Sequence, residues 1–221
     1  MCWSHRRMRD RPFLECLAEL DAPIARLTGR GARTIVVAGM SQGGLGALAF
    51  GARRSGLAGI IALTPNGAPE RLVSLFPQVA ESVAQALAMV AAGHDDERAS
   101  FTDLNIRGPF SVNTTAAIYL SFFDPTGPAN MLDNITRLRE PLLWVAGTAD
   151  RSQPGPGYAF SRAPANPQNA IIRSVRTISA PLPPPAKPCL PGCRNCDSRR
   201  YPCILHRTLP RSHSFPKVGA G

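Results

Sequence analysis

The chain has 221 residues, of which 44% are hydrophobic, and its formal net charge at pH 7 is +10. This length and composition fit one folded domain and exclude a chain that is disordered throughout. No run of about 18 apolar residues occurs, so no membrane span is predicted. The basic N-terminus is not followed by the apolar segment of a secretory signal, and we expect a cytoplasmic protein.

The positive charge is concentrated at the C-terminal end. Lys and Arg outnumber Asp and Glu by 11 to 1 in residues 151–221, whereas residues 41–150 carry 7 against 10. A basic tail can bind nucleic acid or an anionic surface. Its composition is nevertheless that of a solvated, disordered segment, so we expect no nucleic-acid partner and leave the oligomeric state open.

The first half of the chain alternates helix and strand patterns. Residues 15–26 have the apolar spacing of a helix, and residues 34–38 form a short β-branched run typical of a buried strand. A helix rich in small residues is predicted over 43–54, and a second buried strand over 59–64. This alternation indicates an α/β fold with a mostly parallel sheet.

The second half continues the alternation after a long interruption. Helical spacing runs through 70–92 with a kink at Pro77, and a further helix is predicted over 111–122. Strands are predicted at 141–146 and, more weakly, at 171–178. Because residues 68–134 are too many for a simple crossover, we expect a helical cap inserted there. The predicted domain covers 1–180, and the Pro-, Arg- and Cys-rich tail covers 181–221.

A G-x-S-x-G motif at Gly39 to Gly43 is the feature of the sequence that indicates catalysis by a serine. It lies between a predicted buried strand and a predicted helix, which is the context that gives this short motif meaning. The turn must be sharp, so Ser41 is expected at a strained backbone angle with an exposed hydroxyl. Side chains at 39 and 43 would clash there, which predicts glycine at both positions. The N–H of Gln42 is expected to face an oxyanion at the positive end of the helix.

The alternative for this motif is a glycine-rich turn of another α/β fold, such as one that binds phosphate. Neither the dinucleotide-binding pattern nor the P-loop pattern matches. The segment Val-Val-Ala-Gly-Met-Ser-Gln-Gly-Gly resembles the nucleophile turn of serine hydrolases of the α/β-hydrolase family, and Leu-Leu-Trp-Val-Ala-Gly-Thr-Ala-Asp resembles the later strand and acid-bearing turn of that family. The resemblance covers about residues 15–180 and implies a partial α/β-hydrolase fold with a nucleophile, an acid and a histidine in that order.

Asp150 is the acid that the resemblance implies. It follows the predicted strand at 141–146 and a Gly-Thr turn, and it would orient the histidine and stabilise its imidazolium form. An ordinary aspartate in a turn is the alternative. Asp124 and Asp133 are weaker candidates, because neither follows a predicted buried strand.

The histidine is missing from its expected place. The family pattern puts it just after the last strand, but no histidine occurs between His94 and His206. His206 and His213 satisfy the chain order only, so the catalytic histidine stays unassigned. Without a base, a serine hydroxyl is a poor nucleophile at neutral pH. A change of reading frame near residue 170 would account for the lost histidine and for the altered composition that follows.

The N-terminal part is short for this family. The family has several strands before the nucleophile strand, and an early loop supplies a second oxyanion donor. Only about 33 residues precede Thr34 here. We therefore expect the nucleophile strand near an uncovered sheet edge.

Two groups of residues could hold a metal. The tail carries the spacing expected of one half of a tetrahedral zinc site, with no standard second half; its candidate ligands are Cys189, Cys193, Cys196, Cys203 and His206. We expect a disordered tail rather than a zinc site. Residues 94–97 (His-Asp-Asp-Glu) are interpreted as a solvated turn that opens a helix.

The sequence thus predicts hydrolysis of an ester or related acyl bond of a small molecule, with no cofactor. Ser41 would attack, the Gln42 N–H would hold the oxyanion, and Asp150 would support the histidine. A non-catalytic remnant of a hydrolase is the first alternative. A basic metal-binding tail on a hydrolase scaffold is the second.

Overall fold

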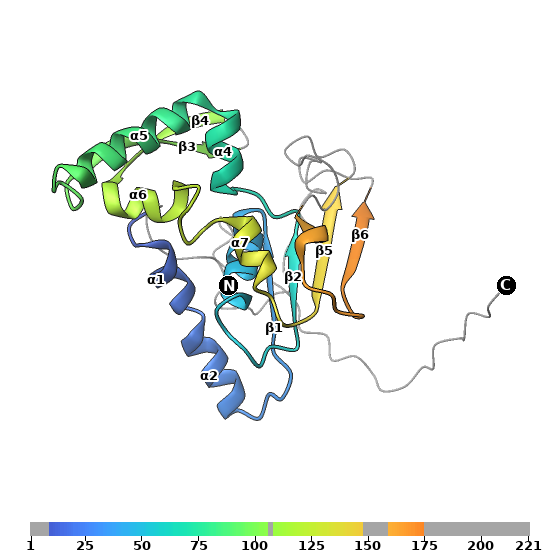
Figure 1. The fold of residues 1–221 in the computed structure, drawn as a ribbon. Coiled ribbons are helices and arrows are strands. Elements are labelled where there is room, and N and C mark those ends of the chain that lie inside the picture. The colour runs from blue at the N-terminus through green and yellow to red at the C-terminus, as the bar shows by residue number, and fades with distance from the viewer. Residues whose placement is uncertain (1–8, 106–107, 148–158, 175–221) are drawn as a thin grey trace, which may run out of the picture. The chain divides into compact units, whose positions relative to one another are not determined.

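The computed structural model describes residues 9–105, 108–147 and 159–174, which belong to one compact unit, Met1–Ser179. The predicted domain boundary at residue 180 and the predicted tail lie outside the described residues. In the described part, a parallel sheet carries helices on one face, and a separate group of helices and one hairpin lies beside it (Figure 1).

The main sheet has four parallel strands in the order β1-β2-β5-β6. These are β1 (Val36–Met40), β2 (Gly59–Leu63), β5 (Leu142–Gly147) and β6 (Ala170–Ser174). The predicted α/β layer is therefore confirmed. β1 lies at one edge of the described sheet, as predicted, and Val36 and Met40 on it are 48% and 59% exposed.

Helix α3 (Gln42–Gly51) packs on β1 and β2. Its small residues allow this close approach: a Cβ on Gly51 would lie 2.2 Å from the Cδ1 atom of Ile60. Residues 44–51 are all buried. The predicted small-residue helix is thus confirmed, because only a slim helix can lie this near the sheet. Helix α7 (Met131–Thr136) packs against α3 in turn.

The segment between β2 and α7 forms what we call the cap, residues 69–123. It contains α4 (Pro69–Leu75), α5 (Pro77–Ala91), β3 (Arg98–Asn105), β4 (Gly108–Thr115) and α6 (Ala116–Phe123). The axes of α4 and α5 differ by 116° across Phe76, so the predicted kink at Pro77 is confirmed. No single helix in the described ranges is long and apolar enough to cross a membrane, although α4 and α5 pass that test as a bent pair.

The predicted cap insertion contains helices, but it also contains a β-hairpin that the sequence pattern did not predict. Residues 111–115, predicted as helix, belong to β4, which pairs antiparallel with β3. Val112 and Thr114 favour a strand because their β-branched side chains are restricted in a helix. The helix begins only at Ala116, after Thr115, whose hydroxyl accepts a hydrogen bond from the Ile118 N–H at 3.2 Å. Residues 94–97 accordingly precede β3 and do not open a helix.

The helix predicted over 15–26 is two helices, α1 (Phe13–Ala18) and α2 (Asp21–Gly29). Pro23 supplies the reason, because proline has no N–H to donate to the carbonyl of Glu19 in a continuous helix. In the first turn of a new helix that missing donor costs little. The short 3₁₀ helix η1 (Phe160–Arg162) completes the described elements.

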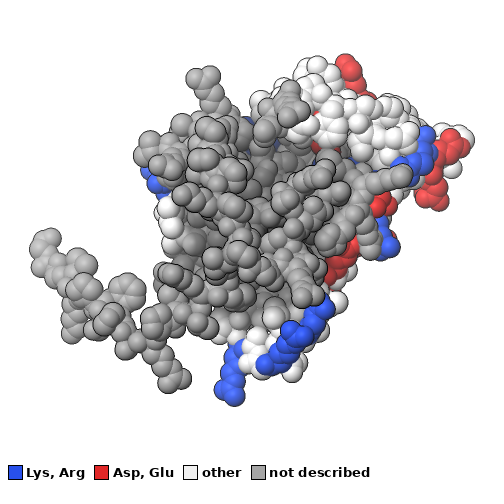
Figure 2. Space-filling model, turned by 180° about the vertical axis from the view of Figure 1, so that it is seen from behind, with Lys and Arg blue, Asp and Glu red and all other residues white. Residues whose placement is uncertain are grey.

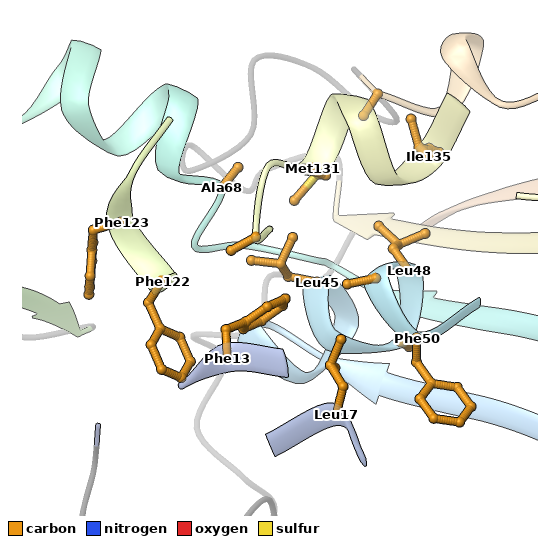
Figure 3. Packing of buried hydrophobic residues seen from close by; sticks show 14 of the residues in the cluster. Phe13, Leu17, Leu45, Leu48, Phe50, Ala68, Phe122, Phe123, Met131 and Ile135 are labelled. Carbon is orange, nitrogen blue, oxygen red and sulfur yellow. The ribbon is translucent and has the colours of Figure 1, made fainter. Parts of the chain in front are cut away.

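Buried hydrophobic side chains join the cap, α1 and α3 (Figure 3). Phe13 lies between Leu45 of α3 and Phe122 of α6, and its ring meets that of Phe122 edge to face with 5.3 Å between the centroids. In the cap, Tyr119 stacks between Phe101 and Phe123 at 4.5 Å from each. A six-residue helix such as α1 is unstable alone, so this packing is what holds it.

Candidate active site

Ser41 occupies the turn between β1 and α3 with φ 55° and ψ −122°. This confirms the predicted strained backbone, since a non-glycine residue at such an angle costs about 1–3 kcal/mol. The Ser41 N–H donates to the carbonyl of Leu63 at 3.0 Å, and its own carbonyl accepts from the N–H groups of Gly44, Leu45 and Asn66. These bonds tie the turn to the ends of both β2 and α3, which offsets the strain.

Gly39 allows this turn, because a Cβ there would lie 1.9 Å from the carbonyl oxygen of Gly43. The matching prediction for Gly43 is wrong: apart from its chain neighbours and the backbone of its own helix, no described atom lies within 4 Å of the position of its Cβ. The second close approach is at Gly44, where a Cβ would lie 2.9 Å from the Cβ of Pro65. The loop after β2, rather than the turn itself, therefore limits the size of the side chains at the start of α3.

Gln42 is the first residue of α3, and its N–H has no hydrogen-bond acceptor among the described residues. The first N–H groups of a helix are always left free by the helix itself, and they carry the positive end of its dipole. This N–H could therefore bind a negative oxygen beside Ser41. Loss of such a donor typically costs about 10²–10³ in rate.

The side chain of Gln42 contacts Arg9, a residue that the sequence did not single out. With the amide oriented so that both groups are satisfied, its oxygen accepts from Nη1 and Nη2 of Arg9 at 2.5 and 2.8 Å. Such an orientation is assigned from the hydrogen-bond network. Arg9 also donates from Nε to Asp103 in β3 at 3.0 Å, and its Nη2 lies 3.0 Å from the same carboxylate oxygen.

The Arg9 guanidinium is buried in the cap. The Arg9 and Asp103 side chains are 7% and 3% exposed, and the guanidinium carbon lies 4.2 and 4.9 Å from the ring centres of Phe122 and Phe123. The Thr114 hydroxyl donates to the Arg9 carbonyl at 2.6 Å. Burial lowers the pKa of Arg9, and the neighbouring Asp103 carboxylate opposes this shift.

Thr64 is a second strained residue beside Ser41. It follows β2 at φ 39°, which is rare for a β-branched residue. Its N–H donates to the carbonyl of Val145 at 2.6 Å, whereas its buried hydroxyl has no partner among the described residues. Strained residues gather at functional sites, and these two stand at the carboxyl ends of adjacent strands.

The other predicted site residues are not brought to Ser41 by the described part of the chain. Asp150, His206 and His213 lie outside it. Asp124 ends α6 and accepts hydrogen bonds from the N–H and hydroxyl of Thr126, and Asp133 lies within α7. His94 follows α5, which runs away from the sheet (Figure 1), and it pairs with Glu97 at 2.7 Å on the surface.

No protein-family model and no curated protein matches the chain. Among solved structures it is similar to monoacylglycerol lipase of Paleococcus ferrophilus, with a TM-score of 0.50 and 18% identity over 74% of this chain. It is also similar to acetyl xylan esterase 1 of Thermoanaerobacterium sp. (TM-score 0.44, 15% identity, 73% of this chain and 45% of that one) and to an esterase of Pyrococcus furiosus (0.44, 14%, 72% and 53%). The chain spans 65% of the length of the lipase, and at this identity the likeness shows the fold alone.

Proposed function

We propose that this chain, which has a partial α/β-hydrolase fold, is a serine hydrolase that acts on an ester or related acyl bond of a small molecule. The observation that carries the proposal is the strained Ser41 at the strand-to-helix turn, tied to the ends of β2 and α3, where the start of α3 packs closely on Gly39. Ser41 is half-buried at the carboxyl edge of the parallel sheet, the edge at which such folds bind their ligands.

The proposed reaction uses Ser41 as the nucleophile. Its oxygen would attack the acyl carbon while a base removes the hydroxyl proton, and the carbonyl oxygen would become an oxyanion held by the Gln42 N–H. Collapse of this intermediate would release the alcohol, which takes up the proton, and water would then hydrolyse the acyl-serine. Asp150 would orient the base, for which His206 and His213 qualify by chain order alone.

A fluorophosphonate probe should label Ser41 and no other serine. Among the described serines, Ser41 is the one at a strained turn with an adjacent free N–H for the phosphoryl oxygen. The measurement is mass-spectrometric mapping of the adduct in the full chain, with Ser41→Ala as the negative variant. Ser74→Ala is the matched control, because that exposed helical hydroxyl donates to the carbonyl of Arg71 and should not react. An adduct on another serine, with Ser41 unmodified, would refute the proposal.

Turnover of p-nitrophenyl acetate should be slow, far below the roughly 10 per second of an ordinary enzyme. The only histidine that the structure describes, His94, is paired with Glu97, so no described base serves Ser41. Above the hydrolysis caused by imidazole alone, added imidazole should raise the rate in the parent chain but not in Ser41→Ala, since a free base would replace the missing one. A fast rate without imidazole would show that the chain holds its own base, whereas no Ser41-dependent rate in either condition would identify a non-catalytic remnant.

A further inference from the structure

We propose that Arg9 is a positioning residue of this site: it fixes the side chain of Gln42 and, with it, the peptide whose N–H faces the oxyanion. The catalytic role of that N–H depends on the proposed function. The contacts that join Arg9 to Gln42 are observed in the structure.

The Gln42 side chain is confined on two sides. Its amide oxygen lies between two N–H groups of Arg9. Its Cβ and Cγ pack near Gly67, where an added Cβ would lie 4.0 and 3.8 Å from them. Gly67 has φ 87°, an angle that favours glycine. The side chain therefore has little freedom to change rotamer, and any rotation of the peptide before it would break both contacts.

Arg9 is itself held firmly enough to act as an anchor. Asp103 accepts a hydrogen bond from the Nε of Arg9 and forms an ion pair with its Nη2. The rings of Phe122 and Phe123 lie against the guanidinium, and the Thr114 hydroxyl donates to the Arg9 carbonyl. All four partners belong to the cap. Hydrogen bonds to a buried charged group are strong, because water does not compete for them. Arg9 thus links these cap residues to Gln42, the first residue of α3.

The arrangement favours positioning over a direct charge effect. The Asp103 carboxylate neutralises Arg9 at 3.0 Å, so little net charge is left to attract a substrate. The guanidinium still fixes the orientation of the Gln42 side chain, since it donates two hydrogen bonds to the amide oxygen. A donor already aimed at the developing oxyanion requires no reorganisation during the reaction.

In Figure 2 the part of the cap that is not grey is mostly uncharged, and acidic and basic side chains lie at its margin. The Arg9–Asp103 pair is different from those groups, because it is buried. Among the described ion pairs, it is also the one whose arginine contacts the residue next to Ser41.

The test compares the rate of fluorophosphonate labelling at Ser41 in four full-length proteins: the parent, Gln42→Leu, Arg9→Met with Asp103→Leu, and the triple variant. The paired substitution removes both charges together, so the core keeps apolar packing and no buried charge is left alone. We expect Gln42→Leu and the paired variant each to label about tenfold more slowly, as a misaimed donor loses part of its effect. The triple variant should be no slower than either, because both changes remove one contact.

Replacing another Arg–Asp pair provides the control. Arg54 and Asp21 form a bidentate pair between α2 and the end of α3, and neither contacts Gln42. Arg54→Met with Asp21→Leu should leave the labelling rate within about twofold of the parent. A folded Arg9→Met/Asp103→Leu protein that labels at the parent rate would overturn the proposal, and so would additive losses in the triple variant.

The backbone order parameter of Gln42, measured by 15N NMR relaxation, separates this inference from the proposed function. If the parent does not react with the probe at all, the proposed function fails, but the order parameter still reports on the peptide. It should be near the roughly 0.85 of a rigid backbone in the parent and in the Arg54 control, and clearly lower in Arg9→Met/Asp103→Leu. Equal order parameters in the folded proteins would overturn the role of Arg9 regardless of activity.

Discussion

Gly39→Ala should lower the free energy of unfolding by about 3 kcal/mol, the upper end of what overpacking costs, and should reduce labelling of Ser41 on the order of 100-fold. The added Cβ would lie 1.9 Å from the Gly43 carbonyl oxygen and 2.8 Å from the Gly44 nitrogen. Both are backbone atoms of α3 and cannot turn aside as the end of a side chain would. Relief requires a shift of α3 away from β1, which moves the Gln42 N–H. Urea unfolding and probe kinetics measure the two effects.

Gly43→Ala is the matched control for this prediction. It lies four residues further on in the same motif, and apart from its chain neighbours and the backbone of its own helix, no described atom lies within 4 Å of its Cβ position. Alanine favours a helix more than glycine does, so the stability should be unchanged or raised by up to about 0.5 kcal/mol. Equal effects of the two substitutions would mean that the turn tolerates a Cβ at 39 and that the geometry of β1 and α3 is wrong.

Asp103→Leu alone should lower the free energy of unfolding by roughly 3–5 kcal/mol, because it leaves the Arg9 charge buried without a partner. Arg9→Met alone should cost a similar amount by isolating Asp103. The two substitutions together should return the stability to within about 1 kcal/mol of the parent, since apolar pairs often replace buried ion pairs without loss. Urea unfolding of the four proteins gives the coupling energy directly.

The Arg54–Asp21 pair is again the comparison, this time for stability. Its side chains are 42% and 46% exposed, and exposed pairs contribute at most about 1 kcal/mol. Its single substitutions should therefore have small effects. If Asp103→Leu also costs less than about 1 kcal/mol, Arg9 does not lie buried beside Asp103, and the anchor that we infer for Gln42 is absent.

The features that could be predicted from the sequence are local ones. The β-branched runs that became β1 and β2, the turn at Gly39 and Ser41, and the kink at Pro77 each depend on a few adjacent residues. Their preferences can be recognised in a short stretch of sequence, although tertiary contacts hold them in the folded chain. Local preference also misled: the apolar spacing over 15–26 hides the break that Pro23 causes, and the apolar residues after 111 hide the pairing of β4 with β3.

Only the tertiary structure decided how the site is supported. Arg9 contacts Gln42, which lies 33 positions later in the sequence, and Asp103, which lies 94 positions later. The residues next to each of the three do not indicate that these contacts form. The same holds for Gly44, which is small because Pro65 from another loop lies against it. A turn is determined by the dihedral preferences of neighbouring residues, whereas a buried polar contact exists only once folding has excluded water around it, so its partners can be recognised only in the folded chain.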